Sequence, residues 1–174
     1  FQGHDVYSEV ATPDDNLFND KPSVILIHGF GCSSYYWRET VQALTAAGYT
    51  AHSLDLLGQG KSSKPGRADG IDYSIDLWAS QVEEYAKQYI LSKNKNQPIV
   101  VMGNSLGSSV ALSVASGDFG KRTQTNSLVQ ERIAGICLYN CGVGMNSRNL
   151  LKDESLGPVQ RFVFTALFDL FDVL

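Results

Sequence analysis

Two short runs of the chain, residues 24–28 and 99–102, are almost entirely apolar, and each is entered after a proline and left through a glycine. Such runs are typical of strands that are covered on both faces of a sheet. Further strands are predicted at residues 49–54, ending at Asp55, and at residues 133–139. Residues 1–11 alternate well enough between polar and apolar positions to predict an antiparallel edge strand.

Helical spacing of apolar residues fills the intervals between these strands. Residues 35–48 and 74–90 repeat apolar side chains every three or four positions, and Ser74 can cap the second of these helices. Residues 105–115 predict a helix of small residues, and residues 117–130 a polar loop. The alternation predicts an α/β fold with a mostly parallel, doubly wound sheet.

The character of the chain changes after Asn140. Residues 141–149 are rich in turn-forming residues, and residues 159–174 predict an apolar helix. Large side chains would lie on more than one face of that helix, namely Phe162, Phe164, Leu167, Phe168 and Phe171. We therefore expect it to pack against partners on several sides.

Composition narrows the possible functions. Of the 174 residues 43% are hydrophobic, and 14 basic residues stand against 18 acidic ones without a run of either sign. We expect no nucleic-acid binding, no transmembrane segment and no metal site or other cofactor, which leaves small-molecule or lipid chemistry. The three cysteines, Cys32, Cys137 and Cys141, lack the spacing of zinc or disulfide frameworks and are predicted to be free thiols.

Gly60-Lys61-Ser62 carries the last letters of a phosphate-binding loop. That loop also needs a glycine where this chain has Asp55, and a helix that opens directly after the serine. Residues 63–66, Ser-Lys-Pro-Gly, would break a helix instead. We therefore do not expect nucleotide binding here.

Gly103-Asn104-Ser105-Leu106-Gly107 fits the pattern G-x-S-x-G between a predicted buried strand and a predicted helix. In such a turn the serine hydroxyl projects above the sheet, and Gly103 and Gly107 avoid collisions with the neighbouring strand and helix. Ser105 is the candidate catalytic nucleophile. The alternative is a tight strand-to-helix turn without catalytic function.

A nucleophilic serine that attacks an acyl group needs donors for the oxyanion of its tetrahedral intermediate. The Leu106 N–H, next to the serine, is one candidate. The loop His28-Gly29-Phe30-Gly31 is the second source by position, with the Phe30 N–H as donor and with Gly29 and Gly31 allowing close approach. His28 is expected to be structural.

The chain resembles the α/β-hydrolase family in the order and separation of three sequence blocks. These blocks are HGFG at 28–31, SLDLLGQGKSSKP at 53–65 and VVMGNSLG at 100–107. The segments DLLGQGKS and GNSLG are similar to those of the family branch that includes pheophytinase and chlorophyll dephytylase, which are esterases that act on long isoprenoid esters. The resemblance implies that residues 1–145 are the N-terminal part of the hydrolase core, that residues 146–174 begin a helical cap, and that the rest of the core is absent from this chain. Localisation is left open: we expect a soluble intracellular protein, in a plastid if the resemblance to the dephytylases holds.

The resemblance also implies a triad acid and histidine after the serine, but the histidines, His4, His28 and His52, all precede Ser105. The sequence thus predicts a serine hydrolase that cleaves an apolar carboxylic ester through an acyl-enzyme, with its base outside this chain, so that these residues alone would be nearly inactive. Two alternatives remain: a non-catalytic binding module, and carbon–carbon bond hydrolysis or perhydrolysis on the same serine. Epoxide and haloalkane hydrolysis are disfavoured because they use a carboxylate nucleophile.

Overall fold

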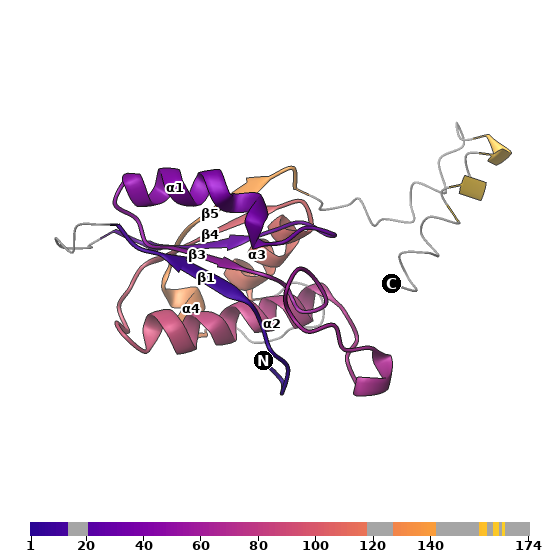
Figure 1. The fold of residues 1–174 in the computed structure, drawn as a ribbon, viewed down its shortest axis with the longest axis horizontal. Helices are drawn as coiled ribbons and strands as arrows, with labels where there is room; N and C mark the ends of the chain where they lie inside the picture. Colours follow the sequence, from indigo (N-terminus) through magenta and orange to yellow (C-terminus); the bar gives the residue numbers. More distant parts are fainter. Residues whose placement is uncertain (14–20, 118–126, 142–156, 160–161, 164, 166–174) are drawn as a thin grey trace. The chain divides into compact units, whose positions relative to one another are not determined.

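Among the residues that the structure describes, five strands form one sheet in the order β1-β3-β2-β4-β5 (Figure 1). Their bounds are Ser8–Ala11 (β1), Ser23–Ile27 (β2), Ala51–Leu54 (β3), Ile99–Asn104 (β4) and Ile133–Tyr139 (β5). Strands β3, β2, β4 and β5 are parallel, and β1 pairs antiparallel with β3 at one edge. The mostly parallel sheet predicted from the alternating pattern is confirmed, as is the antiparallel edge strand.

The computed structural model describes residues 1–13, 21–117, 127–141, 157–159, 162–163 and 165 of the chain. Within them the main helices are α1 (Arg38–Ala46), α2 (Ile75–Tyr85), α3 (Leu106–Ser116) and α4 (Leu128–Glu131). A 3-10 turn, Ser34–Trp37, leads into α1, and a π-helical segment, Ala86–Leu91, extends α2. The predicted cap of α2 is confirmed, since Ser74 Oγ accepts the Leu77 N–H at 3.1 Å.

Helix α4 corrects one prediction, because it lies at the end of the segment expected to be a loop. Its first turn is closed by a reciprocal pair of hydrogen bonds. The Ser127 N–H donates to Gln130 Oε1 at 2.9 Å, and the Gln130 N–H donates to Ser127 Oγ at 3.3 Å. A helix this short shows little apolar periodicity, so only the capping residues marked it in the sequence.

Hydrophobic residues fill both sides of the sheet, as the doubly wound arrangement requires. Val24 and Leu26 of β2 point to the cluster that packs against α1, which includes Trp37. Their neighbours Ile25 and Ile27 point to the opposite cluster, which α2 and α3 complete. Because successive side chains of a strand face opposite ways, β2 is buried along its whole length. This rigid centre positions the loops that follow β2, β3 and β4.

The other edge of the sheet is strand β5, which is much more exposed than its neighbour β4. Ile136 and Leu138 keep 38% of their surface exposed and Tyr139 47%, whereas β4 is mostly buried.

The chain separates into two units, Phe1–Cys141 and Gly142–Leu174. Of the predicted final helix, residues 159, 162, 163 and 165 are helical, and the remainder, Phe164, Leu167, Phe168 and Phe171 included, lies outside the described residues.

Candidate active site

Ser105 occupies the junction between β4 and α3 in a backbone conformation that few residues adopt. Its φ is 53° and its ψ is −115°, and a positive φ in a residue with a Cβ is strained. The Ser105 N–H donates to the Tyr139 carbonyl at 2.8 Å, which ties the turn to the end of β5. The side chain is half-buried, and none of the described residues forms a hydrogen bond with its hydroxyl.

Glycines on either side make this turn possible. A Cβ at Gly103 would collide with the carbonyl of Gly107, and a Cβ at Gly107 would collide with the carbonyl of Ile27 in β2. Both obstacles are backbone atoms that cannot move aside. The collisions expected from the G-x-S-x-G pattern are therefore present at both glycines.

The loop after β2 packs directly against the Ser105 turn. A Cβ at Gly29 would lie 3.3 Å from the Ser105 Cβ and equally close to the Asn104 side chain. The loop makes a tight turn, in which the Cys32 N–H donates to the Gly29 carbonyl at 3.2 Å, and Gly31 has a φ of +70°. Phe30, at the tip of this turn, is 52% exposed.

The Leu106 N–H lies at the N-terminus of α3, where backbone N–H groups lack carbonyl partners within the helix. The turn therefore sets the hydroxyl of Ser105 beside the positive end of a helix dipole. Of the predicted donors, Leu106 adjoins Ser105 in the chain, and Phe30 follows the glycine that contacts the serine.

His28 is fully buried and serves the architecture of this region. The Leu56 N–H donates to its Nε2 at 3.1 Å, so the ring proton is on Nδ1, which donates to the Gly29 carbonyl at 2.7 Å. Burial lowers the pKa of His28, against smaller opposing effects of the Gly29 hydrogen bond and the Asp55 carboxylate. Both nitrogens are occupied, which fits a structural residue and leaves no lone pair for a proton from Ser105.

The turn at residues 55–62 is closed by its own side chains. Asp55 Oδ1 accepts the Ser34 N–H at 2.5 Å and Oδ2 accepts the Lys61 N–H at 2.7 Å. Ser62 Oγ donates to the Asp55 carbonyl at 2.7 Å and accepts the Tyr7 N–H at 3.0 Å. Lys61 Nζ is exposed and bonds Tyr7 Oη at 3.0 Å, which raises the pKa of Lys61. Residues 63–66, directly after this turn, are not helical, so the turn lacks the N–H cradle of a phosphate-binding loop.

The remaining histidines offer no base for Ser105. His52 is buried within β3, where its Nδ1 lies 3.0 Å from Tyr85 Oη. Burial, with a smaller contribution from Lys93, lowers the pKa of His52 to about 4. His4 precedes β1, and its carbonyl accepts from the amino group of Phe1. Among the described residues, no carboxylate or imidazole forms a hydrogen bond with Ser105.

The contacts of four polar side chains around the site were not predicted from the sequence. Ser108 Oγ lies 2.8 Å from the Gly103 carbonyl and 2.9 Å from the Tyr139 carbonyl. Asn140 Nδ2 donates to Asn104 Oδ1 at 3.1 Å. Gln59 Oε1 accepts the Gly31 N–H at 2.8 Å. Apart from the bond between Ser108 and Gly103, each contact joins segments distant in sequence, and only Asn104 and Gln59 lie inside a motif that could have suggested them.

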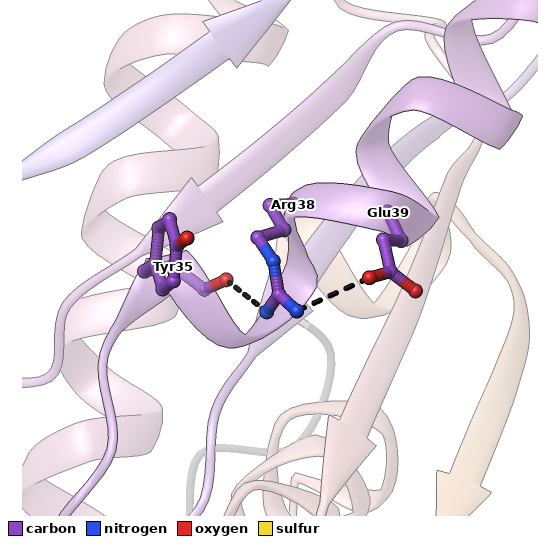
Figure 2. Close-up of polar contacts among 3 residues, drawn as sticks. All are labelled: Tyr35, Arg38 and Glu39. Atoms are coloured by element: carbon purple, nitrogen blue, oxygen red, sulfur yellow. Dashed lines mark hydrogen bonds and ion pairs between the residues drawn. The ribbon is translucent and has the colours of Figure 1, made fainter.

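Aromatic side chains follow the loop after β2 along the chain. Tyr35 is 69% exposed, and the Arg38 guanidinium stacks on its ring at 4.8 Å while bonding Glu39 at 3.1 Å (Figure 2). Tyr36 contacts Trp37 edge-on, and Trp37 in turn contacts Tyr139.

Cys32 is half-buried, Cys137 and Cys141 are exposed, and all three are free thiols, as predicted.

The chain belongs to the α/β hydrolase family, whose pattern, described as the alpha/beta hydrolase fold, matches residues 22–138. The match covers the strands from β2 to β5 and both glycine turns. It makes the protein a member of a hydrolase superfamily. Within the described ranges, no helix is both long and apolar enough to cross a membrane.

Among curated proteins, the chain is similar to a probable lysophospholipase, BODYGUARD 3, of Arabidopsis thaliana, with 34% identity over 118 residues, 66% of this chain and 22% of that protein. It is also similar to the chloroplastic pheophytinase of Arabidopsis thaliana, with 29% identity, 59% of this chain and 25% of that protein. The matches thus span about a quarter of these relatives.

Solved structures share the fold. A probable hydrolytic enzyme from Pseudomonas aeruginosa superposes with a TM-score of 0.63 at 21% identity, over 89% of this chain and 42% of that one. An esterase from Exiguobacterium antarcticum superposes with a TM-score of 0.59 at 21% identity, over 80% of this chain and 42% of that one.

Proposed function

We propose that this protein is a serine-type carboxylic ester hydrolase in which Ser105 forms an acyl-enzyme. The observation that carries the proposal is the strained turn of Ser105, half-exposed at the head of α3 and packed against the glycine loop after β2. A residue held at positive φ costs about 1–3 kcal/mol, which is typical of functional positions. The hydrolases among its relatives support the same class of reaction.

In the proposed reaction, Ser105 Oγ attacks the ester carbonyl carbon and gives its proton to a base. The Phe30 and Leu106 N–H groups would hold the oxyanion, and His28, Gly29, Gly31, Gly103 and Gly107 would support the two turns. The tetrahedral intermediate collapses, the alcohol leaves with a proton returned by the base, and water then hydrolyses the acyl-enzyme to regenerate the serine.

We place the base and its acid partner outside the described residues, in sequence that continues the core. No histidine of the chain follows Ser105, and the hydrogen bonds of His28 and His52 are internal. The exposed apolar side chains of β5 support further core beyond this edge, because such an edge is normally covered. Residues 1–145 would then be the front part of the core and residues 146–174 the start of a cap.

The proposed substrate is a small-molecule ester with an apolar acyl or alcohol group. The exposed aromatic rings of Phe30, Tyr35, Tyr36 and Tyr139 favour apolar ligands over charged ones. The lysophospholipase and pheophytinase among the relatives are named for lipid-like substrates, which supports this class.

The test is labelling of the full-length protein with a fluorophosphonate probe, together with turnover of p-nitrophenyl esters of graded chain length. We expect Ser105→Ala to abolish labelling and to lower kcat by about 10⁴-fold to 10⁶-fold. Ser62→Ala is the matched control, because Ser62 is a buried serine in the other glycine turn, and it should leave labelling intact. Equal labelling of Ser105→Ala and wild type would contradict the proposal.

A second candidate function is non-catalytic ligand binding on the same scaffold. It is favoured by one observation: none of the described carboxylates or imidazoles forms a hydrogen bond with Ser105. If the full-length protein binds an apolar ester without turnover and resists the probe, binding becomes the better account.

A further inference from the structure

The turn at residues 55–62 holds the loop after β2 at three points. At the start of the loop, His28 Nε2 accepts the Leu56 N–H at 3.1 Å, and beyond its tip the Ser34 N–H donates to Asp55 Oδ1 at 2.5 Å. The third bond lies between these two: the Gly31 N–H donates to Gln59 Oε1 at 2.8 Å. The outer two bonds fix the ends of the loop, so the middle one fixes its tip.

The tip is the part of the loop that the proposed chemistry uses. Phe30 and Gly31 are the central residues of the turn closed by the Cys32 N–H and the Gly29 carbonyl. With a φ of +70°, Gly31 adopts the conformation of a type II turn. A flip of the Phe30–Gly31 peptide would interconvert turn types, and the bond from Gly31 to Gln59 opposes that flip.

Among the described residues, the Gln59 side chain forms no hydrogen bond other than the one with Gly31. It is only 7% exposed, and its Nε2 is buried without a hydrogen-bond partner among the described residues. A buried donor without an acceptor lowers stability, so fold stability alone does not account for a glutamine here. Because the Gly31 N–H needs an acceptor, the Gln59 side-chain amide must turn its Oε1, and not its Nε2, toward Gly31.

The backbone of Gln59 is itself held rigidly. Its N–H donates to the Leu56 carbonyl at 2.9 Å, and its carbonyl accepts the Ser62 N–H at 3.1 Å. Gly58 and Gly60, on either side, have positive φ and are closed in by Tyr73 and by the Asp55 carboxylate. The side chain therefore starts from a fixed point and reaches across to the loop.

We infer that Gln59 is a positioning residue for the oxyanion loop. By holding the Gly31 N–H it fixes the Phe30–Gly31 peptide, and with it the backbone conformation of Phe30, whose own N–H lies in the preceding peptide. The inference rests on the proposed function, because it assigns Gln59 to the same ester hydrolysis. Gln59 touches no reacting atom. Its effect should appear in the transition state, where the oxyanion forms, and much less in substrate binding.

The test compares kcat and KM for p-nitrophenyl esters in the full-length protein carrying Gln59→Met, Gln59→Asn or Gln59→Glu. Methionine has a similar length but no amide, asparagine is too short to reach Gly31, and glutamate keeps an acceptor oxygen. We expect Gln59→Met and Gln59→Asn each to lower kcat about 10-fold to 100-fold with KM within about 3-fold. Gln59→Glu should retain most of the wild-type kcat.

Lys61→Met, in the same turn, is the matched control, because Lys61 is exposed and its side chain contacts Tyr7 rather than the loop. It should leave kcat unchanged. Thermal unfolding of every variant identifies any that fail to fold, in which case the other non-bonding variant decides.

Three results would overturn the inference. Wild-type kcat in the folded Gln59→Met or Gln59→Asn variant, or an equal loss in Gln59→Glu, would refute it while Ser105→Ala remained inactive. Wild-type turnover in Ser105→Ala would refute the proposed function, and the inference with it.

Discussion

Two glycine turns of this protein follow β3 and β4, the parallel strands on either side of β2, yet they are built in different ways. The turn at residues 55–62 is closed by side chains: Tyr73 fills the space at Gly58, and the Asp55 carboxylate fills the space at Gly60. The turn at residues 103–107 is closed by backbone, since Gly103 meets the Gly107 carbonyl and Gly107 meets the Ile27 carbonyl. In this second turn, none of the described side chains forms a hydrogen bond with the serine hydroxyl.

The serines of the two turns differ accordingly. Ser62 is 2% exposed, and its hydroxyl both donates to the Asp55 carbonyl and accepts the Tyr7 N–H. Ser105 is half-buried at positive φ, and no described residue bonds its hydroxyl. A hydroxyl is available for chemistry where the surrounding structure does not satisfy it. Glycine content alone therefore does not identify a catalytic turn.

The largest expected effect comes from adding a methyl group to the glycines. Gly107→Ala should destabilise the full-length protein by more than about 3 kcal/mol, because the new Cβ meets the backbone of β2. Gly60→Ala should cost less, since the obstacle is a side chain, although its φ of +54° adds strain. Urea unfolding measures both changes.

Gly66→Ala is the control for these substitutions. Gly66 has a φ of −99° and no atom within 4 Å of an added Cβ, so the change should stay within about 1 kcal/mol of wild type. If Gly60→Ala proved as severe as Gly107→Ala, the distinction between side-chain and backbone closure would be wrong.

Acid should weaken the structure around the turn at residues 55–62 more than the turn at residues 103–107. Burial lowers the pKa of His28, which accepts the Leu56 N–H, and lowers the pKa of His52 to about 4. Both are therefore neutral when folded and protonate more readily when unfolded, so stability is complete above pH 6.5 and falls as the pH drops. For His52 the loss approaches about 3 kcal/mol at pH 4. The described part of the Ser105 turn contains no titratable side chain.

The measurement is the free energy of unfolding between pH 7.5 and pH 4, in wild type and in His52→Gln. The variant keeps a polar group near Tyr85 but cannot titrate, so its curve should be flatter than that of wild type. Parallel curves would show that His52 does not contribute to the pH dependence.

Sequence patterns identified the strands and the Ser105 turn because those features are local. The buried strands repeat apolar residues, and G-x-S-x-G states its own spacing. The contacts of Gln59, Asn104 and Ser108 could not be predicted, because each depends on which loops meet at one edge of the sheet. Helix α4 was missed although it is a local feature, because its four residues are too few for a periodic pattern.

The smallest expected effect concerns which substitution, alanine or glycine, is the more stable at the two serines, because the order should be opposite at positions 105 and 62. At position 105 the strain belongs to the Cβ, so Ser105→Gly should be more stable than Ser105→Ala by about 1 kcal/mol. At position 62 the φ is not positive, so Ser62→Ala should be more stable than Ser62→Gly by a similar amount. Both Ser62 variants should lie about 1–3 kcal/mol below wild type, because the half-buried Tyr7 N–H loses its acceptor. The same order of alanine and glycine at both positions would mean that Ser105 is not strained, and the argument for its availability as a nucleophile would then rest on its missing hydrogen-bond partner alone.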